Sequence, residues 1–560
     1  MSIDPITIEV VTSRIREIAS TMEHALYHSG YSPVLRESKD GTAGLTDADG
    51  RVVIVSGGLQ YHSLPYQHAV RSVLARYPKE TLVPGESFIV NDPYLGGNPH
   101  APDMVAITPG FTAGVLIGFG VSVAHKADIG GLVPGSSGAA SREIYHDGLL
   151  LPPVRYQTAA GIEESIEAII SRNSRIPDVV LGDLRAQVGC TRLGVERLAA
   201  LCTEYGTESI AQIMREILER TAMRVAAELR AIPDGCAEME GFLDHDGADL
   251  GTPIRIHVRA EKKGDRLILD FSKSSPQARG PVNCNKTTAQ AVALLALLAA
   301  TDPSIPVNSG ITQPVEFIMP DGIVVNPQHP ATVNHYFPTS HLTYNVVLAA
   351  LGELNPARAV APSGLGNGAI AIGYARARGG KPAVQYELMC TALGGTSDHD
   401  GSSIVQAMNH ITPGAPVEIV ETEYPVRVRR YDIWTDSAGP GQHRGGVGYV
   451  REYEVLEDCT MTARTSNHHF PAWGIRGGGA PATSRTTVNP DRDDRIELGP
   501  IETRLLRAGD VLRLEQSGGG GFGDPHARDP LAVADDVRNG YVSAAAARAA
   551  YGVDVDAVTA

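Results

Sequence analysis

The chain has 560 residues, of which 42% are hydrophobic and 20% are charged, a composition typical of folded rather than disordered proteins. Its formal net charge of −16 argues against binding to the phosphate backbone of nucleic acids, because such binding needs a basic face. At roughly 150 residues per domain, the length predicts three or four domains with substantial hydrophobic cores.

The sequence shows no targeting segment and no membrane span. The N-terminus, MSIDPITIEV, lacks a basic stretch followed by an apolar run, so it does not indicate a signal peptide. The most apolar run, Ala291 to Ala300, is about half the length that crosses a bilayer and therefore predicts a buried helix. The six cysteines form no CxxC pair and are interpreted as reduced thiols. Together these features predict a soluble, cytoplasmic protein.

The first elements along the chain form a helix and a hairpin. Asp4 followed by Pro5 is typical of a helix start, and apolar residues then recur at steps of three and four from Ile8 to Ala25. We therefore expect a helix that ends near Ser29. Residues 44–58, GLTDADGRVVIVSGG, predict two strands joined by an Asp-Gly turn.

A second hairpin is expected in residues 103–125. The segments MVAI and GVLIGFGVSVA are typical of strands, and TPGFTAG between them contains turn residues. Asp103 begins the first of these strands and His125 follows the second. Because antiparallel strands bring these two ends together, the hairpin places Asp103 near His125.

Taken as a whole, the sequence predicts an α+β, multi-domain fold. Its N-terminal part is a mixed α/β metal-binding domain with antiparallel hairpins, its middle is helical, and its C-terminal part is rich in β-structure and glycine. The helical middle breaks before Pro177, a hairpin turns at Lys263-Gly264, and helices are expected near 287–300 and 339–351. The predicted domains or segments are 1–160, 161–235, 236–360, 361–525 and a helical tail, 526–560.

Two short stretches carry the candidate chemistry. NDPYLGGNPHAPD ends with His100 and Asp103, and AHKADIGG contains His125 and Asp128. Imidazole nitrogens together with carboxylates suit Zn, Mn or Fe(II). Structural zinc prefers four closed ligands that usually include cysteine, and no cysteine is near in the sequence, so an open catalytic site is favoured. The spacing alone is equally typical of loop residues that cap a turn or contact water.

Several motifs, in order along the chain, resemble the hydantoinase B/oxoprolinase family. They are the N-terminal segment DPITIEVVTSRIREIASTMEHALYHSGYSPVLRESKD, the two stretches above, SREIYHDGLLLPPV, DSAGPGQHRGGVG and SGGGGFGDPHARDPLAVADDVRNGYVS. This family comprises metal-bearing subunits or domains of ATP-dependent cyclic-amide hydrolases, namely N-methylhydantoinase, 5-oxoprolinase and caprolactamase. It also includes the corresponding subunits of acetone and acetophenone carboxylases.

The resemblance implies a site for one divalent ion, Mn or Zn. The family's ligands fall on His100, Asp103 and His125, and a further carboxylate ligand known in some members falls on Asp40. For Asp128 we expect a hydrogen bond to the imidazole of His125 that fixes its tautomer. A general base and a simple turn cap are the alternatives for Asp128.

The same resemblance implies that the chain is one subunit of a hetero-oligomeric hydrolase. An actin-like ATPase subunit of the hydantoinase A type, which binds ATP and Mg, phosphorylates the carbonyl oxygen of a hydantoin, oxoproline or lactam ring, and the metal of this chain assists ring opening. An ATP-dependent ketone carboxylase of the acetophenone or acetone type is the alternative enzyme, because the same ligands serve both reactions. A non-catalytic scaffold for the ATPase partner is the third interpretation.

Four further sequence features have weaker interpretations. Glu143, His146 and Asp147 in SREIYHDG are expected near the metal loop without an assigned role, and His399 is expected in a turn or near substrate. The adjacent His468 and His469 diverge, which favours packing over metal binding. The segment SGGGGFGDP lacks the GK[ST] ending of a phosphate loop and is interpreted as a tight backbone passage.

Overall fold

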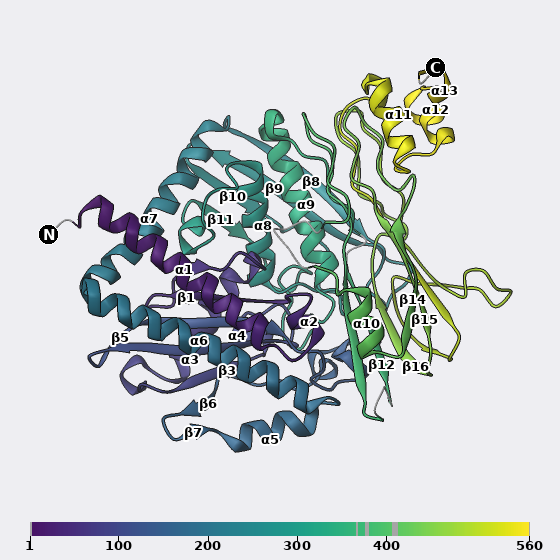
Figure 1. Cartoon of the computed structure of the whole chain (residues 1–560). Helices are drawn as coiled ribbons and strands as arrows, with labels where there is room; N and C mark the ends of the chain where they lie inside the picture. Colours follow the sequence, from purple (N-terminus) through teal and green to yellow (C-terminus); the bar gives the residue numbers. More distant parts are fainter. Residues whose placement is uncertain (1–2, 366–367, 376–379, 406–412, 559–560) are drawn as a thin grey trace.

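The computed structural model describes residues 3–365, 368–375, 380–405 and 413–558. It confirms a multi-domain α+β fold built on four sheets. Helices and sheets of the first half of the chain form one side of the molecule, the strands of the second half form the other side, and the C-terminal helices form a small group at its edge (Figure 1).

Helix α1 (Pro5–Ser29) confirms the predicted N-terminal helix. The carboxylate of Asp4 accepts a hydrogen bond of 3.0 Å from the backbone N–H of Thr7 and so caps the helix. Val11, Ile15 and Met22 of its apolar stripe are fully buried, whereas Ala25 at the end of the stripe is partly buried. The stripe packs against α6 (Pro177–Tyr205), the helix that begins at the predicted break.

The first sheet has seven strands in the order β2-β1-β5-β4-β3-β6-β7. The strand bounds are β1 Gly41–Thr46, β2 Val52–Val55, β3 Ser87–Val90, β4 Asp103–Thr112, β5 Val115–His125, β6 Val154–Thr158 and β7 Gly161–Ile162. Val105 and Ile107 of β4 pack in the cluster beneath α3 (Ser63–Arg76), whereas Met104 and Ala106 pack in the cluster beneath α6. Since helices cover both faces of its central strands, this sheet is a rigid support for residues at strand ends.

The second sheet has four strands in the order β11-β10-β9-β8 and shares a hydrophobic core with two apolar helices. The element bounds are β8 Gly235–Leu243, β9 Ile254–Lys263, β10 Arg266–Asp270, β11 Val315–Ile318, α8 Lys286–Ala300 and α9 Phe337–Leu354. The predicted hairpin turns at Gly264, and both predicted helices are present. Helix α8 is buried along nearly its whole length, as its uniformly apolar sequence predicts.

Two further sheets, in the orders β13-β12-β16-β19 and β14-β15-β20-β17-β18, share a hydrophobic core. The strand bounds are β12 Gly368–Tyr374, β13 Ala383–Met389, β14 Val426–Ile433, β15 Tyr449–Val455, β16 Cys459–Arg464, β17 Arg485–Val488, β18 Ile496–Leu498, β19 Ile501–Leu506 and β20 Val511–Gln516. Inside this core the guanidinium of Arg451 contacts the carboxylate of Glu387 at 2.7 Å, and both side chains are almost fully buried.

The glycine run after β20 is the predicted tight backbone passage. A Cβ atom added at Gly519 would lie 2.0 Å from the carbonyl oxygen of Leu393, and one at Gly520 would lie 2.0 Å from that of Trp473. Only glycine allows the backbone segments to approach so closely. Backbone hydrogen bonds then tie the run to neighbouring loops on both sides.

The other helices connect or flank these layers. Their bounds are α2 Pro33–Arg36, α4 Pro93–Gly96, α5 Glu164–Asn173, α7 Thr207–Ala231, α10 Val417–Glu423, α11 Pro530–Arg538, α12 Ala544–Tyr551 and α13 Val555–Val558. Arg528 anchors the C-terminal helices, because its guanidinium contacts Asp400 at 2.7 Å and Asp536 at 2.8 Å.

Helices of the predicted segment 161–235 pack on the preceding sheet, since α6 contacts β4 and β5. The five domain boundaries remain predictions. Within the part of the chain that the structure describes, no helix is both long enough and apolar enough to cross a membrane.

Candidate metal centre

The β4–β5 hairpin creates the centre of the site. Asp103, the first residue of β4, and His125, the last residue of β5, are direct partners in the antiparallel register. His100 lies in the turn that precedes β4, where the backbone N–H of Asp103 donates to the carbonyl oxygen of His100. The structure therefore brings together the three residues that the sequence singles out.

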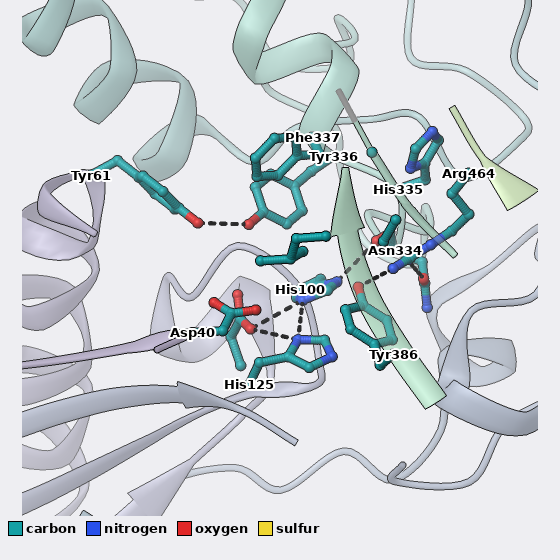
Figure 2. Close-up of a pocket in the computed structure, with 14 residues that line it drawn as sticks. Asp40, Tyr61, His100, His125, Asn334, His335, Tyr336, Phe337, Tyr386 and Arg464 are labelled. Carbon is teal, nitrogen blue, oxygen red and sulfur yellow. Dashed lines mark hydrogen bonds and ion pairs between the residues drawn. The ribbon is translucent and has the colours of Figure 1, made fainter. Parts of the chain in front are cut away.

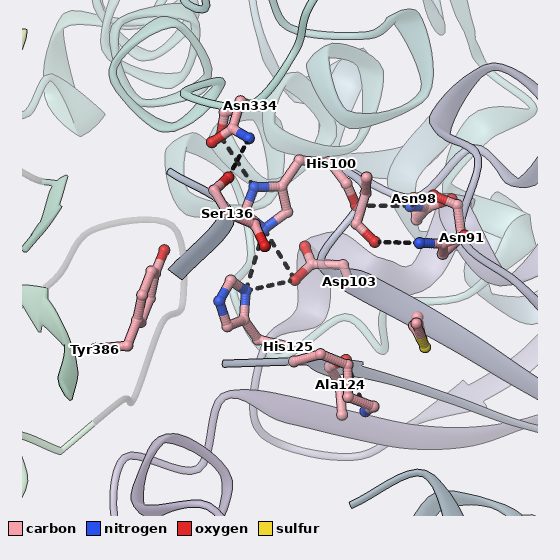
Figure 3. Close-up of polar contacts among 12 residues, drawn as sticks. Asn91, Asn98, His100, Asp103, Ala124, His125, Ser136, Asn334 and Tyr386 are labelled. Carbon is pink, nitrogen blue, oxygen red and sulfur yellow. Dashed lines mark hydrogen bonds and ion pairs between the residues drawn. The ribbon is translucent and has the colours of Figure 1, made fainter. Parts of the chain in front are cut away.

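The three side chains point their donor atoms at one another (Figure 3). Oδ1 of Asp103 lies 3.1 Å from Nε2 of His100 and 3.1 Å from Nδ1 of His125. The two histidine nitrogens are 3.2 Å apart. All three residues are buried, so bulk water does not satisfy these atoms.

A backbone contact fixes the tautomer of His100. Its Nδ1 lies 2.9 Å from the carbonyl oxygen of Asn334, which can only accept a hydrogen bond, so Nδ1 carries the proton. In the neutral ring Nε2 then presents a lone pair to Asp103 and His125. Metal-binding histidines usually have this arrangement: one ring N–H donates to a carbonyl, and the other ring nitrogen faces the metal and its other ligands.

The donor set fits a divalent cation. A tetrahedral ion about 2.0–2.1 Å from its ligands holds them roughly 3.3 Å apart, close to the observed separations of 3.1–3.2 Å. One proton shared among three electron-rich atoms satisfies only part of these contacts, whereas a cation at their centre satisfies all of them. Two nitrogens and one oxygen suit Zn or Mn.

Asp40 lines the same cavity from the loop before β1. Its backbone carbonyl accepts a hydrogen bond from the N–H of His125 at 3.1 Å, which fixes the loop against the end of β5. Burial raises the pKa of the Asp40 carboxyl well above its usual range, and the negative charge of Asp103 raises this pKa further. A cation in the cavity would oppose both effects, so Asp40 fits the role of an additional carboxylate ligand.

His125 and Asp103 have the protonation states that metal ligands need, a neutral imidazole and an ionised carboxylate. Burial lowers the pKa of the His125 imidazole to about 4, so the ring is neutral at physiological pH. Burial alone would raise the pKa of the Asp103 carboxyl, but its close contacts with the His100 and His125 imidazoles hold this pKa well below its usual range.

The cavity is closed by residues from distant parts of the chain (Figure 2). Its free volume is about 20 Å³, which is room for about one water molecule or ion. The residues that complete its wall are Tyr61, Asn334, His335, Tyr336, Phe337, Gly368, Ala369, Tyr386, Leu388 and Arg464. None of these stands out in the sequence, because no local spacing relates residues 61, 334–337, 386 and 464.

Nε2 of His125 has no hydrogen-bond partner among the described residues and is buried. The ring packs against that of Tyr386 in a tilted arrangement, with a centroid distance of 4.3 Å. A buried N–H without an acceptor is costly, and in a cavity it offers a donor to a bound molecule. The site therefore presents a cluster of metal-ligand atoms and, beside it, the Nε2–H of His125 as a hydrogen-bond donor.

The structure does not bring Asp128 to the imidazole of His125. Its carboxylate accepts hydrogen bonds from the backbone N–H groups of Gly130, Gly135 and Arg175 at 2.9–3.0 Å. It also forms an ion pair of 3.0 Å with the guanidinium of Arg175. These contacts correspond to the turn-cap alternative, because the carboxylate turns away from the strand end and organises the loop that follows it.

We expect Asp128→Ala to lower the free energy of unfolding while the metal content of the protein stays unchanged. The substitution leaves three backbone N–H groups and the Arg175 guanidinium without their acceptor, which costs on the order of a few kcal/mol. Urea denaturation and elemental analysis of the same preparation measure the two quantities. A variant of normal stability that has lost its metal would instead support the predicted contact with His125.

The other histidines of interest lie outside the cavity. His146 lies 3.7 Å from Glu143 near the surface, and His399 is exposed beside Asp398. The backbone N–H groups of His468 and His469 both donate to the carboxylate of Asp244, which is a packing contact. Of Glu143, His146 and Asp147, the buried residue is Asp147, and burial raises the pKa of its carboxyl to about 7.

Comparisons with known proteins identify the family to which this chain is similar. The sequence profile of the family described as hydantoinase B/oxoprolinase matches residues 4–525. The B-type subunit of a putative D-/L-hydantoinase from Pseudomonas sp. is 28% identical, over 99% of this chain and 95% of its own. The 5-oxoprolinase of Dictyostelium discoideum is 26% identical over 93% of this chain, which covers only 40% of that longer protein.

Two solved structures share the fold. The ATP-dependent caprolactamase from Pseudomonas jessenii superposes with a TM-score of 0.91 and 26% identity, covering 99% of this chain and 96% of that one. A nucleotide-free acetone carboxylase structure also gives a TM-score of 0.91, at 21% identity, covering 98% of this chain and 79% of that one. With a profile match over nearly its whole length, this chain belongs to the hydantoinase B/oxoprolinase family.

Proposed function

We propose that this chain is the metal-bearing subunit of an ATP-dependent hydrolase that opens cyclic amides such as hydantoins, oxoprolines or lactams. The observation that carries the proposal is the convergence of His100, Asp103 and His125 on one buried point. The full-length similarity to the Pseudomonas hydantoinase chain and to the caprolactamase supports the choice of substrate class.

The chemistry of an unstrained amide explains the need for ATP. Phosphorylation of the carbonyl oxygen by a partner gives an activated carbon. Water then adds to this carbon, the C–N bond opens to an acyl phosphate and a free amine, and a second water releases phosphate. A divalent ion, Mn or Zn, would supply a hydroxide near neutral pH or polarise the activated carbon when bound.

The chain's own residues perform the holding and shielding roles in this scheme. His100, Asp103 and His125 hold the ion, Asp40 adds a carboxylate, and the carbonyl of Asn334 fixes the tautomer of His100. The surrounding aromatic side chains keep bulk water out, which strengthens electrostatic interactions inside the cavity.

We propose that the ATP-binding partner is a separate actin-like subunit carrying ATP and Mg. The longer Dictyostelium 5-oxoprolinase supports a division of labour, because this chain matches only 40% of its length and leaves the rest for other tasks. The hydantoinase and caprolactamase relatives are each named as a single subunit of their enzyme, which also favours a hetero-oligomer.

A ketone carboxylase is the second candidate. The shared fold of acetone carboxylase keeps it open, since the same side chains could hold a metal for either reaction. That structure is less similar in sequence than the caprolactamase, and this chain covers only 79% of it. These differences favour the hydrolase.

The test combines the purified chain with its actin-like partner, ATP, Mg and Mn or Zn. We expect ring-opened product from hydantoin, 5-oxoproline or caprolactam, together with ADP and phosphate. The isolated chain should turn over neither ATP nor the ring. Carboxylation of acetone or acetophenone with bicarbonate, in the absence of ring opening, would identify the alternative enzyme. A pair with metal but neither reaction would favour the scaffold.

A further inference from the structure

Arg464 is a buried cation in the wall of the metal cavity. It is the last residue of β16, only 3% of its surface is exposed, and it contributes to the lining of the cavity. Its guanidinium lies beside Asn334 and Tyr386, on the side of His100 opposite Asp40 (Figure 2). A permanent positive charge in such a place needs a reason, because taking a charge out of water is costly.

The hydrogen bonds of Arg464 use only part of its donor capacity. Nη1 donates to the carbonyl oxygen of Asn334 at 3.1 Å and to its side-chain oxygen at 2.7 Å. Nη2 donates to the hydroxyl of Tyr386. Nε has no acceptor among the described residues. Because a guanidinium has five N–H groups, the Nε–H and one Nη2–H remain for another acceptor.

All of these acceptors are neutral oxygens, which distinguishes Arg464 from the other buried arginines of the described chain. Arg451 forms an ion pair with Glu387, and Arg444 and Arg528 both form ion pairs with Asp536. Buried charges are normally paired in this way. The unpaired guanidinium therefore indicates an anion that the protein itself does not provide.

Tyr386 offers a further donor at the same place. Its hydroxyl oxygen accepts from Arg464, so its own proton is free to point toward a ligand. The guanidinium and the hydroxyl together form a site for an oxyanion.

This oxyanion site is coupled to the metal ligands through one carbonyl group. The carbonyl oxygen of Asn334 accepts from Nδ1 of His100 at 2.9 Å and from Nη1 of Arg464 at 3.1 Å. The anion bound by Arg464 would therefore lie next to the metal ligands. Because the cavity has room for only about one water molecule or ion, the wall around Arg464 has to move outward to admit a larger anion.

We propose that Arg464, assisted by Tyr386, binds the phosphoryl group of the substrate after its carbonyl oxygen has been phosphorylated. This inference rests on the proposed function. A phosphoryl group is common to every activated cyclic amide, whereas hydantoin and caprolactam carry no carboxylate. Arginine matches phosphoryl oxygens with parallel N–H groups, and the resulting charge-assisted hydrogen bonds are strong.

Calorimetric titration of the full, metal-loaded chain with inorganic phosphate tests the proposal. We expect Arg464→Gln and Arg464→Lys each to weaken phosphate binding by about 10- to 100-fold, because both lose the paired N–H groups. Tyr386→Phe should weaken it less. Arg504→Gln is the matched control, since Arg504 lies on the neighbouring strand β19 in a half-exposed pair with Glu502, and it should bind phosphate normally.

Acetate and 6-aminohexanoate serve as carboxylate probes in parallel titrations. Binding of these probes that depends on Arg464 and exceeds that of phosphate would overturn the assignment to a phosphoryl group. Phosphate affinity that is absent, or equal in wild type and both Arg464 variants, would also overturn it. If Arg464→Gln does not fold, Arg464→Lys decides. Ring opening by the assembled wild-type enzyme is measured separately, so a failure of this inference remains distinct from a failure of the proposed function.

Discussion

Combining His100→Ala with Asp103→Ala is expected to abolish both metal binding and ATP-dependent ring opening. The double change removes two of the three converging ligand atoms, and the nitrogen of His125 with the Asp40 carboxylate alone is too small a ligand set to retain the ion. The free energy of unfolding of the metal-free protein should change little, because the double change removes the charged Asp103 carboxylate together with His100, and the His125 ring that loses these contacts is neutral. Elemental analysis, turnover with the partner subunit, and urea denaturation measure the three quantities.

His257→Ala provides a matched control for this experiment. His257 is also a buried histidine that contacts a carboxylate, with its Nε2 lying 3.0 Å from Glu238, but it belongs to the second sheet. The control should keep its metal and its activity. Full metal content in the double variant would show that the ion binds elsewhere, and global unfolding would show that the cluster is structural.

Arg451→Met should lower the free energy of unfolding by about 3–5 kcal/mol, the usual cost of breaking a buried ion pair on one side. The substitution leaves Glu387 charged, buried and without its cation, although the hydroxyl of Tyr453 still donates to it at 2.8 Å. It also removes the contacts of the guanidinium with the rings of Tyr431 and Tyr453. Denaturant titration followed by circular dichroism gives the value.

Two comparisons establish the cause of that loss. Arg507→Gln breaks an exposed pair with Asp458 on the same side of the molecule and should leave the stability nearly unchanged. Replacing both partners, as Arg451→Met with Glu387→Leu, should recover much of the loss, because no charge then remains buried. A single variant as stable as the wild type would contradict the assignment of this pair as a core contact.

The sequence was sufficient to predict the local half of the site. The alternation of apolar residues and the turn between them specify a hairpin, and the register of a hairpin determines which residues meet at its end. Asp103 and His125 are therefore neighbours for reasons visible in a stretch of 23 residues. The helix after Asp4 and the buried helix α8 were predictable in the same way, from a capping residue and from uniform hydrophobicity.

The distant half of the site could not be predicted from the sequence. Tyr386 and Arg464 meet His125 and Asn334 only because separate sheets and loops pack together, and no periodicity within one chain encodes that packing. Asp128 shows a different difficulty. Its distance along the chain from His125 allowed a contact with the imidazole, but the backbone N–H groups of its own turn and of Arg175 compete for the same oxygens.

The two halves of the metal cavity come from different segments of the chain, and this has a consequence for how such proteins diversify. The ion-holding side chains come from residues 40–125, at the ends of central strands in a sheet that is covered on both faces, whereas the opposite wall comes from residues 334–464. Mutations in the second region can reshape the contacts with a ring or ketone while the inherited ion-holding hairpin remains intact. A single scaffold can in this way acquire new substrates without having to reinvent its reactive centre.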